Sequence, residues 1–233
     1  MKPACTVFTN HHRLEQIEFL EDQVEYPKKW NKDTVYYYTE TINIPLLLTK
    51  RQLLTAINLA MTTWDIEIPV RFRSTRDIKL ADIIIAFEDA EINKYFSDRP
   101  SVLAYAYFPG TSLQGTIVFN STYIWDTKGN GVKGSKAVEL GLIDRIDNPN
   151  NILKTYNILH VLIHELGHSL GLTHDITGVN DGKDVMDPFY VGTVLDLSPR
   201  DILRIREKYG IRMYTRWARY NRIKRWLKRR IRR

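Results

Sequence analysis

The spacing of apolar and polar residues divides this chain into strands and helices. Residues 34–41 are β-branched and aromatic, which predicts a strand. Residues 81–87 form a nearly continuous apolar run, as is typical of a strand covered on both faces. Shorter strands are predicted at residues 70–72, 103–108 and 116–119, and a Pro-Gly pair joins the last two.

Helical spacing marks three segments. Apolar residues recur at intervals of three and four over residues 50–64, which predicts an amphipathic helix. Residues 151–170 predict a second helix. Ser198 starts a third, with a proline in the first turn and an acid three residues after the cap, and Gly210 suits its end. Residues 126–151 are rich in Gly, Asn and charge, so we expect a long surface loop there.

The two ends of the chain differ from its body. Residues 1–28 show little periodicity and are expected to form an N-terminal extension. Residues 211–233 contain eleven Lys and Arg and no acid, so removing them from the net charge of +7 leaves −4 on residues 1–210. The basic charge therefore belongs to a C-terminal tail, and residues 29–210 are expected to form one domain.

Composition narrows the class of protein. An apolar fraction of 43% is enough for a sizeable core. The sequence contains no run of about 18 apolar residues, so it predicts no membrane span. The first residues contain no apolar segment of the kind found in secretory signals, so we expect none, and localisation is left open. Cys5 is the only cysteine, which excludes an internal disulfide and a thiolate zinc cluster.

Candidate chemistry is concentrated in HELGHSLGLTHD, which begins at residue 164. On a helix, His164 and His168 lie on one face, so both imidazoles can reach one zinc ion while Glu165 approaches a metal-bound water. Gly171 can turn the chain at positive φ and return His174 as a third ligand. Three ligands leave the fourth zinc position open, which indicates a catalytic site. The alternative is a buried helix that carries histidines by chance.

The order of these segments resembles the catalytic domain of the matrixins, the matrix metalloproteinases of the metzincin clan. The resemblance covers residues 29–210 and rests on several stretches beside the zinc motif. These are KKWNKDTVYYY, IPVRF after a helix ending in Trp64, ADIIIAF, LAYAYFPG, Met186 followed by DPFY, and LSPRDILRIREKYG. It implies an α+β metzincin fold, with a twisted, mostly parallel five-stranded sheet, three helices and two lobes around an active-site cleft.

The resemblance assigns roles to single residues. His164, His168 and His174 match the zinc ligands, and Glu165 matches the general base. Met186 matches the methionine of the Met-turn beneath the zinc, although an ordinary core methionine would also fit.

Other matches concern substrate binding. Leu103 and Ala104 fall on the edge strand whose backbone binds an extended substrate. Pro188 and Tyr190 fall on the wall of the first primed-side pocket. His160 falls where the family varies the depth of that pocket, which implies a shallow or intermediate pocket; the alternative is a histidine that is simply packed.

Departures from the family pattern concern other ions. The family carries a second, structural zinc held by histidines and an aspartate, but Tyr105 and Val118 stand at matching positions and the His-Gly-Asp stretch is replaced within residues 91–97. We therefore expect one catalytic zinc and no structural zinc. Calcium dependence is doubtful, because residues 120–122 read Asn-Ser-Thr where the family has acids.

Two further positions differ. Asp175 stands where matrixins have a small hydroxyl residue. An aspartate at this position is similar to the pattern of the adamalysins. Cys5 follows Pro-Ala, a faint likeness to the family's inhibitory cysteine motif, and the alternative is a plain unpaired thiol.

The tail carries apolar residues at helical spacing among its cations. They are Met213, Trp217, Tyr220, Ile223, Leu227 and Ile231. This basic amphipathic pattern suits an anionic membrane, a sulfated glycan or a nucleic acid, and a solvated charge run is the alternative.

Two functions follow from these residues. The first is a monomeric zinc endopeptidase that hydrolyses extended peptides and proteins. The second is a catalytically idle metzincin scaffold that binds partners through the tail. The intact Glu165 favours the first.

Overall fold

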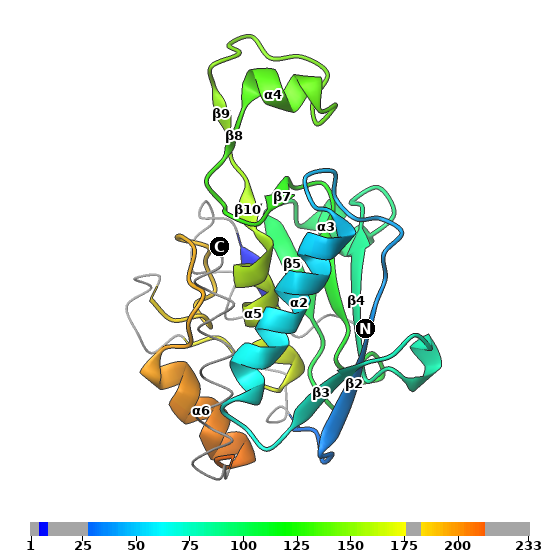
Figure 1. Cartoon of the computed structure of the whole chain (residues 1–233), viewed down its shortest axis with the longest axis vertical. Helices are drawn as coiled ribbons and strands as arrows, with labels where there is room; N and C mark the ends of the chain where they lie inside the picture. Colours follow the sequence, from blue (N-terminus) through cyan, green and yellow to red (C-terminus); the bar gives the residue numbers. More distant parts are fainter. Residues whose placement is uncertain (1–4, 9–27, 176–182, 213–233) are drawn as a thin grey trace.

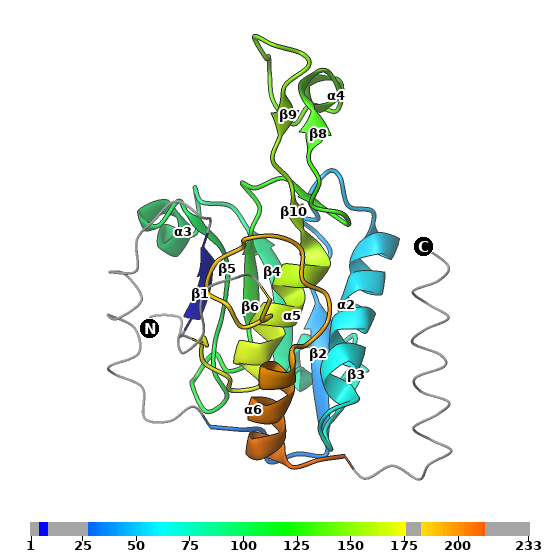
Figure 2. The same cartoon turned by 90° about the vertical axis from the view of Figure 1, so that its left-hand side faces the viewer.

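A computed structural model describes residues 5–8, 28–175 and 183–212 of the chain, and for residues 5–8 it describes the backbone alone. One six-stranded sheet forms the centre, in the order β1-β5-β6-β4-β2-β3 (Figures 1 and 2). The strands are β1 (Cys5–Phe8), β2 (Thr34–Thr39), β3 (Arg71–Ser74), β4 (Ile83–Glu88), β5 (Val102–Ala106) and β6 (Ile117–Asn120).

Five of these strands are those predicted from the sequence. β3, β2, β4 and β6 run parallel, and β5 runs antiparallel to β6. The expectation of a mostly parallel five-stranded sheet is therefore confirmed. The structure adds β1, which comes from the N-terminal extension and pairs antiparallel with β5. The rest of the expected extension, residues 1–4 and 9–27, lies outside the described residues.

Three main helices accompany the sheet: α2 (Lys50–Asp65), α5 (Ile158–Ser169) and α6 (Pro199–Tyr209). α2 and α5 lie side by side on one face of the sheet, and α6 lies beyond the end of α5 (Figure 2). A capping box of Thr49 and Gln52 begins α2, and one of Ser198 and Asp201 begins α6. Each box satisfies backbone N–H groups that have no partner inside the helix.

The expectation of a long surface loop at residues 126–151 was wrong in part, because this segment contains short strands and a helix. β8 (Val132–Lys133), α4 (Gly134–Glu139) and β9 (Ile152–Leu153) form a segment that projects from the body, and β7 (Trp125–Asp126) lies at its base (Figure 1). β8 pairs with β9, and β10 (Tyr156–Asn157) pairs with β7. The zinc-motif helix consequently begins at Ile158 and not near residue 151, since the residues before it are paired as strands.

Two apolar clusters form the core. The larger one lies between the sheet and the helices α2 and α5, where Leu53, Ile57 and Trp64 of α2 are fully buried. The smaller one gathers Tyr105, Val118 and their neighbours at the β5–β6 side. Short elements α3 (Lys94–Asp98) and η2 (Ile78–Leu80) complete the described chain. Among the described residues, no helix combines the length and the apolar character needed to cross a bilayer.

Candidate metal centre

α5 is buried along its whole length, which fits a helix that is apolar on nearly all sides. The side chain of Asn157 caps it by accepting the backbone N–H of His160 at 3.0 Å. From α2, the Trp64 indole donates to the carbonyl of Ile163 at 3.0 Å, and the Trp30 indole donates to the carbonyl of Ser169 at 2.8 Å. These contacts hold the helix that carries the HELGH motif in one position.

The three histidines of the motif converge. The Nε2 atom of His164 lies 2.8 Å from that of His168 and 3.2 Å from that of His174. One ligand atom from each ring lies within 4.8 Å of the other two, and all three residues are buried. In the part of the chain that the structure describes, no other group of three such side chains converges in this way.

Backbone carbonyls fix the tautomers of two rings. The Nδ1–H of His164 donates to Val185 at 2.6 Å, and that of His168 donates to Leu172 at 2.6 Å. Burial holds the pKa of His164 and of His168 well below the usual value, and neighbouring histidines lower both further. Both rings are therefore neutral, with Nε2 unprotonated and directed to the shared point, as zinc requires.

Gly171 turns the chain from α5 towards His174. Its φ of +87° lies in the left-handed region. The N–H of Gly171 donates to the backbone carbonyl of His168 at 2.7 Å, and that of Leu172 donates to the carbonyl of Gly167 at 2.9 Å. A Cβ on Gly171 would collide with the backbone oxygen of Lys28. Glycine is thus required here both by the conformation and by the close approach of another segment.

Met186 lies against the motif helix. It is fully buried, and a Cβ on Gly167 would collide with its sulfur atom. The backbone N–H of Asp175 donates to the Met186 carbonyl at 3.0 Å, so the ligand turn and the methionine turn are joined. Asp201 of α6 accepts the N–H groups of Val185 at 2.9 Å and of Met186 at 3.4 Å.

Asp201 is a residue whose part in this site was missed in the sequence. Its position three residues after a serine cap was visible there and predicted the helix start. Its second contact, to the backbone of residues 185 and 186, depends on how α6 packs. Phe108 was also missed. Its ring packs edge to face against the imidazole of His168, with the ring centroids 5.9 Å apart.

Glu165 and the substrate-binding residues expected from the resemblance are all buried. The Glu165 side chain is fully buried on α5. His160 and Tyr190 are stacked with ring centroids 4.8 Å apart, and Pro188 is buried on the same segment as Tyr190. Leu103 and Ala104 are buried in β5, and Ala104 pairs with Val7 of β1.

His160 has a fixed environment. Its Nδ1 accepts the N–H of Val194 at 3.2 Å, and burial lowers the pKa of His160 to about 4. The Tyr190 hydroxyl accepts the N–H of Asn157 at 3.1 Å. The neutral ring of His160 therefore lies between α5 and the segment 190–194.

This fold and this histidine triad define the catalytic-domain architecture of metzincin zinc peptidases. The chain belongs to the matrixin family, whose model matches residues 29–210. It is 33% identical to matrilysin of Felis catus over 196 residues, which is 81% of this chain and 62% of that protein. It is 26% identical to karilysin of Tannerella forsythia over 187 residues, 78% of this chain and 33% of that protein.

A third relative is macrophage metalloelastase of Oryctolagus cuniculus, 32% identical over 160 residues, 66% of this chain and 28% of that protein. The chain thus spans less than two thirds of the length of each of these three relatives. The resemblance to the matrixins seen in the sequence is confirmed.

Proposed function

We propose that this protein is a zinc-dependent endopeptidase that hydrolyses extended segments of proteins. The observation that carries the proposal is the convergence of three imidazole nitrogens, from His164, His168 and His174, in a matrixin domain. Three nitrogen donors with no thiolate or carboxylate among them are a ligand set that zinc takes in catalytic sites. When bound, zinc supplies Lewis-acid polarisation of the scissile carbonyl and of the attacking water.

The protein's own residues would carry the remaining steps. Glu165, next to His164 on α5, takes the proton of the attacking water and delivers it to the nitrogen of the leaving amine. The carbonyls of Val185 and Leu172 hold two ligand rings in the tautomer that directs Nε2 to the shared point. Met186 supports the helix between the two rings.

The substrate is proposed to lie along β5 as an added antiparallel strand, at the backbone of Leu103 and Ala104. Recognition by a backbone ladder depends little on side chains, which favours broad peptide specificity. β1 pairs with this edge of β5 and also contacts α5. An extended substrate can therefore pair there only when residues 5–8 do not.

The primed-side pocket is proposed to be shallow to intermediate in depth, with Pro188 and Tyr190 in its wall. This proposal is supported by His160, whose buried ring occupies space between α5 and residues 190–194. Small and medium side chains would then be favoured at the residue that enters the pocket. Cleavage profiling with a peptide library measures this directly, and a preference for long aromatic side chains would contradict it.

We propose one zinc ion per chain and no structural zinc. Tyr105 and Val118 pack with Phe96 in the smaller apolar cluster, and the Tyr105 hydroxyl accepts from the amide of Asn93 at 2.9 Å. An apolar cluster with satisfied polar groups can stabilise this region without a metal.

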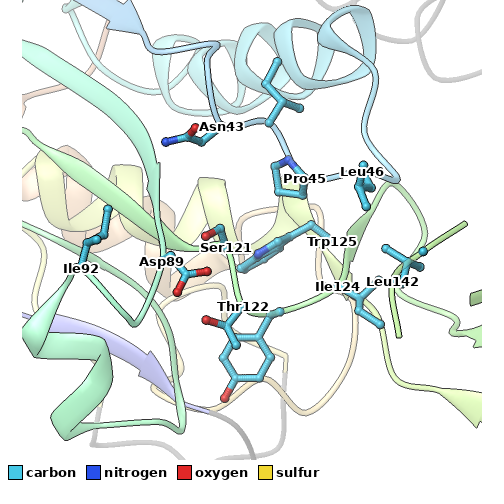
Figure 3. Close-up of a pocket in the computed structure, with 13 residues that line it drawn as sticks. Asn43, Pro45, Leu46, Asp89, Ile92, Ser121, Thr122, Ile124, Trp125 and Leu142 are labelled. Carbon is cyan, nitrogen blue, oxygen red and sulfur yellow. The ribbon is translucent and has the colours of Figure 1, made fainter. Parts of the chain in front are cut away.

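We also propose that no calcium ion is held directly after β6, at residues 120–122, where the sequence makes calcium dependence doubtful. A hollow of about 440 Å³ lies where β4 and β6 end (Figure 3). Its polar lining includes Asn43, Ser121 and Thr122 beside apolar residues, and Asp89 is the one carboxylate in it. Calcium takes about six to eight oxygen ligands, several of them from carboxylates in tight sites, so this lining suits it poorly.

Metal analysis and a cleavage assay on the same preparation test the proposal. Purified protein is expected to hold one zinc ion per chain and to cleave a quenched fluorescent peptide, and a hydroxamate or a chelator should block the cleavage. A preparation without a transition metal would contradict the proposal. Protein that holds zinc but cleaves no peptide would favour the idle scaffold.

The domain limits and the tail remain proposals: an extension at residues 1–28, the catalytic domain at 29–210 and a targeting tail at 211–233, in a monomer. Most of the tail lies outside the described residues. Arg212, however, contacts the body, because its guanidinium lies 2.7 Å from Asp65 and donates to Ile68 at 2.5 Å. A deletion that tests the tail should therefore begin at residue 213.

Binding to anionic liposomes and to DNA separates the roles of the tail. The full chain is expected to bind at least one of them at low salt and to lose binding as salt rises, because the contacts are electrostatic. The variant without residues 213–233 should bind neither. Equal binding by both proteins would leave the tail as a solvated charge run, and light scattering of the full chain checks the monomer.

A further inference from the structure

Two arginines on α6 contact the turn that carries the third histidine. Arg200 and Arg204 are four residues apart and so lie on the same face of the helix. The Arg204 guanidinium donates to the carbonyl of Thr173 at 2.9 Å, to its hydroxyl at 3.0 Å and to the carbonyl of His174 at 3.4 Å. Arg200 lies 3.3 Å from the carboxylate of Asp175.

Arg200 also reaches the segment that leads to Met186, and Arg204 also faces the carboxylate of Asp175. Arg200 lies 3.4 Å from the carboxylate of Asp184, two residues before Met186. Arg204 lies 4.0 Å from the Asp175 carboxylate, which is only 4% exposed. A nearly buried carboxylate is costly unless cations pair with it, so Asp175 depends on these partners. Arginine suits this place because its planar fork can serve several acceptors at once.

The three metal-binding histidines differ in what positions them. His164 and His168 belong to one helix, whose geometry sets their spacing. His174 follows the helix by several residues, so its position depends on the turn at Gly171 and on contacts with other segments. Hydrogen bonds and an ion pair tie the carbonyl of His174 and the residues on either side of it to α6.

We propose that Arg200 and Arg204 are positioning residues of the metal centre, which hold His174 in register with His164 and His168. This inference rests on the proposed zinc site. Groups that orient metal ligands without touching the metal typically change metal affinity by about 10- to 100-fold when they are removed.

The chain offers a matched control on the same helix. Arg206 forms an ion pair with Glu67 of the body, on another side of α6 from the ligand turn. Arg206→Gln therefore also removes an arginine that fastens α6, but it leaves residues 173–175 untouched. A purely structural role for Arg200 and Arg204 predicts that all three arginines affect zinc binding alike.

The test is a zinc dissociation constant, measured by chelator competition on the full-length protein, together with the visible spectrum of the cobalt-substituted protein. The Arg200→Gln/Arg204→Gln variant is expected to bind zinc about 10- to 100-fold more weakly and to give an altered cobalt spectrum. Arg206→Gln should stay within about twofold of the unaltered protein, even where its thermal stability falls. Arg204→Lys, which keeps the charge but loses the fork, should lie between them.

Two results would overturn the inference: unchanged zinc affinity in the folded double variant, or an equal loss in Arg206→Gln. Should the double variant fail to fold, Asp175→Asn replaces it, since this change removes the charge that both arginines face and keeps the volume. Zinc affinity requires no turnover, so the inference can fail while the protease proposal stands. An unaltered protein that binds no zinc would instead refute the proposed function itself.

Discussion

Replacing Glu165 with alanine is expected to reduce peptide cleavage by about 10²- to 10⁴-fold while zinc stays at one ion per chain. The reason is that Glu165 is placed to move the proton and is not one of the three converging ligands. Its side chain is fully buried, so its removal also leaves a small cavity. Turnover in the fluorescent peptide assay and zinc content by elemental analysis are the two measurements.

A second substitution separates proton transfer from packing. Glu165→Gln keeps the volume of the side chain but cannot accept the proton in the same way, so its loss of activity should equal that of Glu165→Ala. Full turnover in either variant, in a preparation free of other proteases, would remove Glu165 from the proposed mechanism. Loss of zinc together with activity would instead assign it a structural role.

Gly171→Ala is expected to lower the free energy of unfolding by about 2–5 kcal/mol. This range adds the cost of a residue with a Cβ at positive φ to the cost of a steric collision. The φ of +87° disfavours any Cβ, and the Cβ would meet the Lys28 backbone oxygen, which cannot move away as a flexible side chain could. Relaxation of this clash would displace the turn that leads to His174, so zinc affinity should fall as well. Urea denaturation of the zinc-loaded protein measures the first effect.

The chain contains a matched site for this prediction. Gly141 also stands between two leucines after a helix, at a φ of +67°, and Leu142 donates its N–H to Ala137 as Leu172 does to Gly167. No atom lies within 4 Å of a Cβ built on Gly141. Gly141→Ala should therefore cost at most about 1–2 kcal/mol, from the backbone alone. An equal decrease in the free energy of unfolding in both variants would show that the contact with Lys28 contributes nothing to the cost of Gly171→Ala.

Much of the fold followed from local patterns. The helix at residues 50–64 was predicted from apolar residues at intervals of three and four, and the strand at residues 81–87 from a nearly continuous apolar run. The segment 126–151 was not predicted well, because its short strands pair with each other and carry no periodic signal of their own. β1 was missed for a similar reason: four residues become a strand only where the edge of β5 is available.

The candidate site divides in the same way. The spacing of His164, Glu165 and His168 determines that two rings share one face of a helix, and a glycine at residue 171 determines that the chain can turn afterwards. These are properties of the backbone over a few residues, and the sequence is sufficient for them.

Only the tertiary structure decided what surrounds those residues. The carbonyl of Val185 selects the tautomer of His164, and Asp201 of α6 holds the backbone of that same Val185. Arg200 and Arg204 reach the turn of His174 from a helix some 25 to 30 residues further along the chain. Contacts between segments so far apart depend on how a helix packs, and the local periodicity that predicts the helix holds no information about its partners.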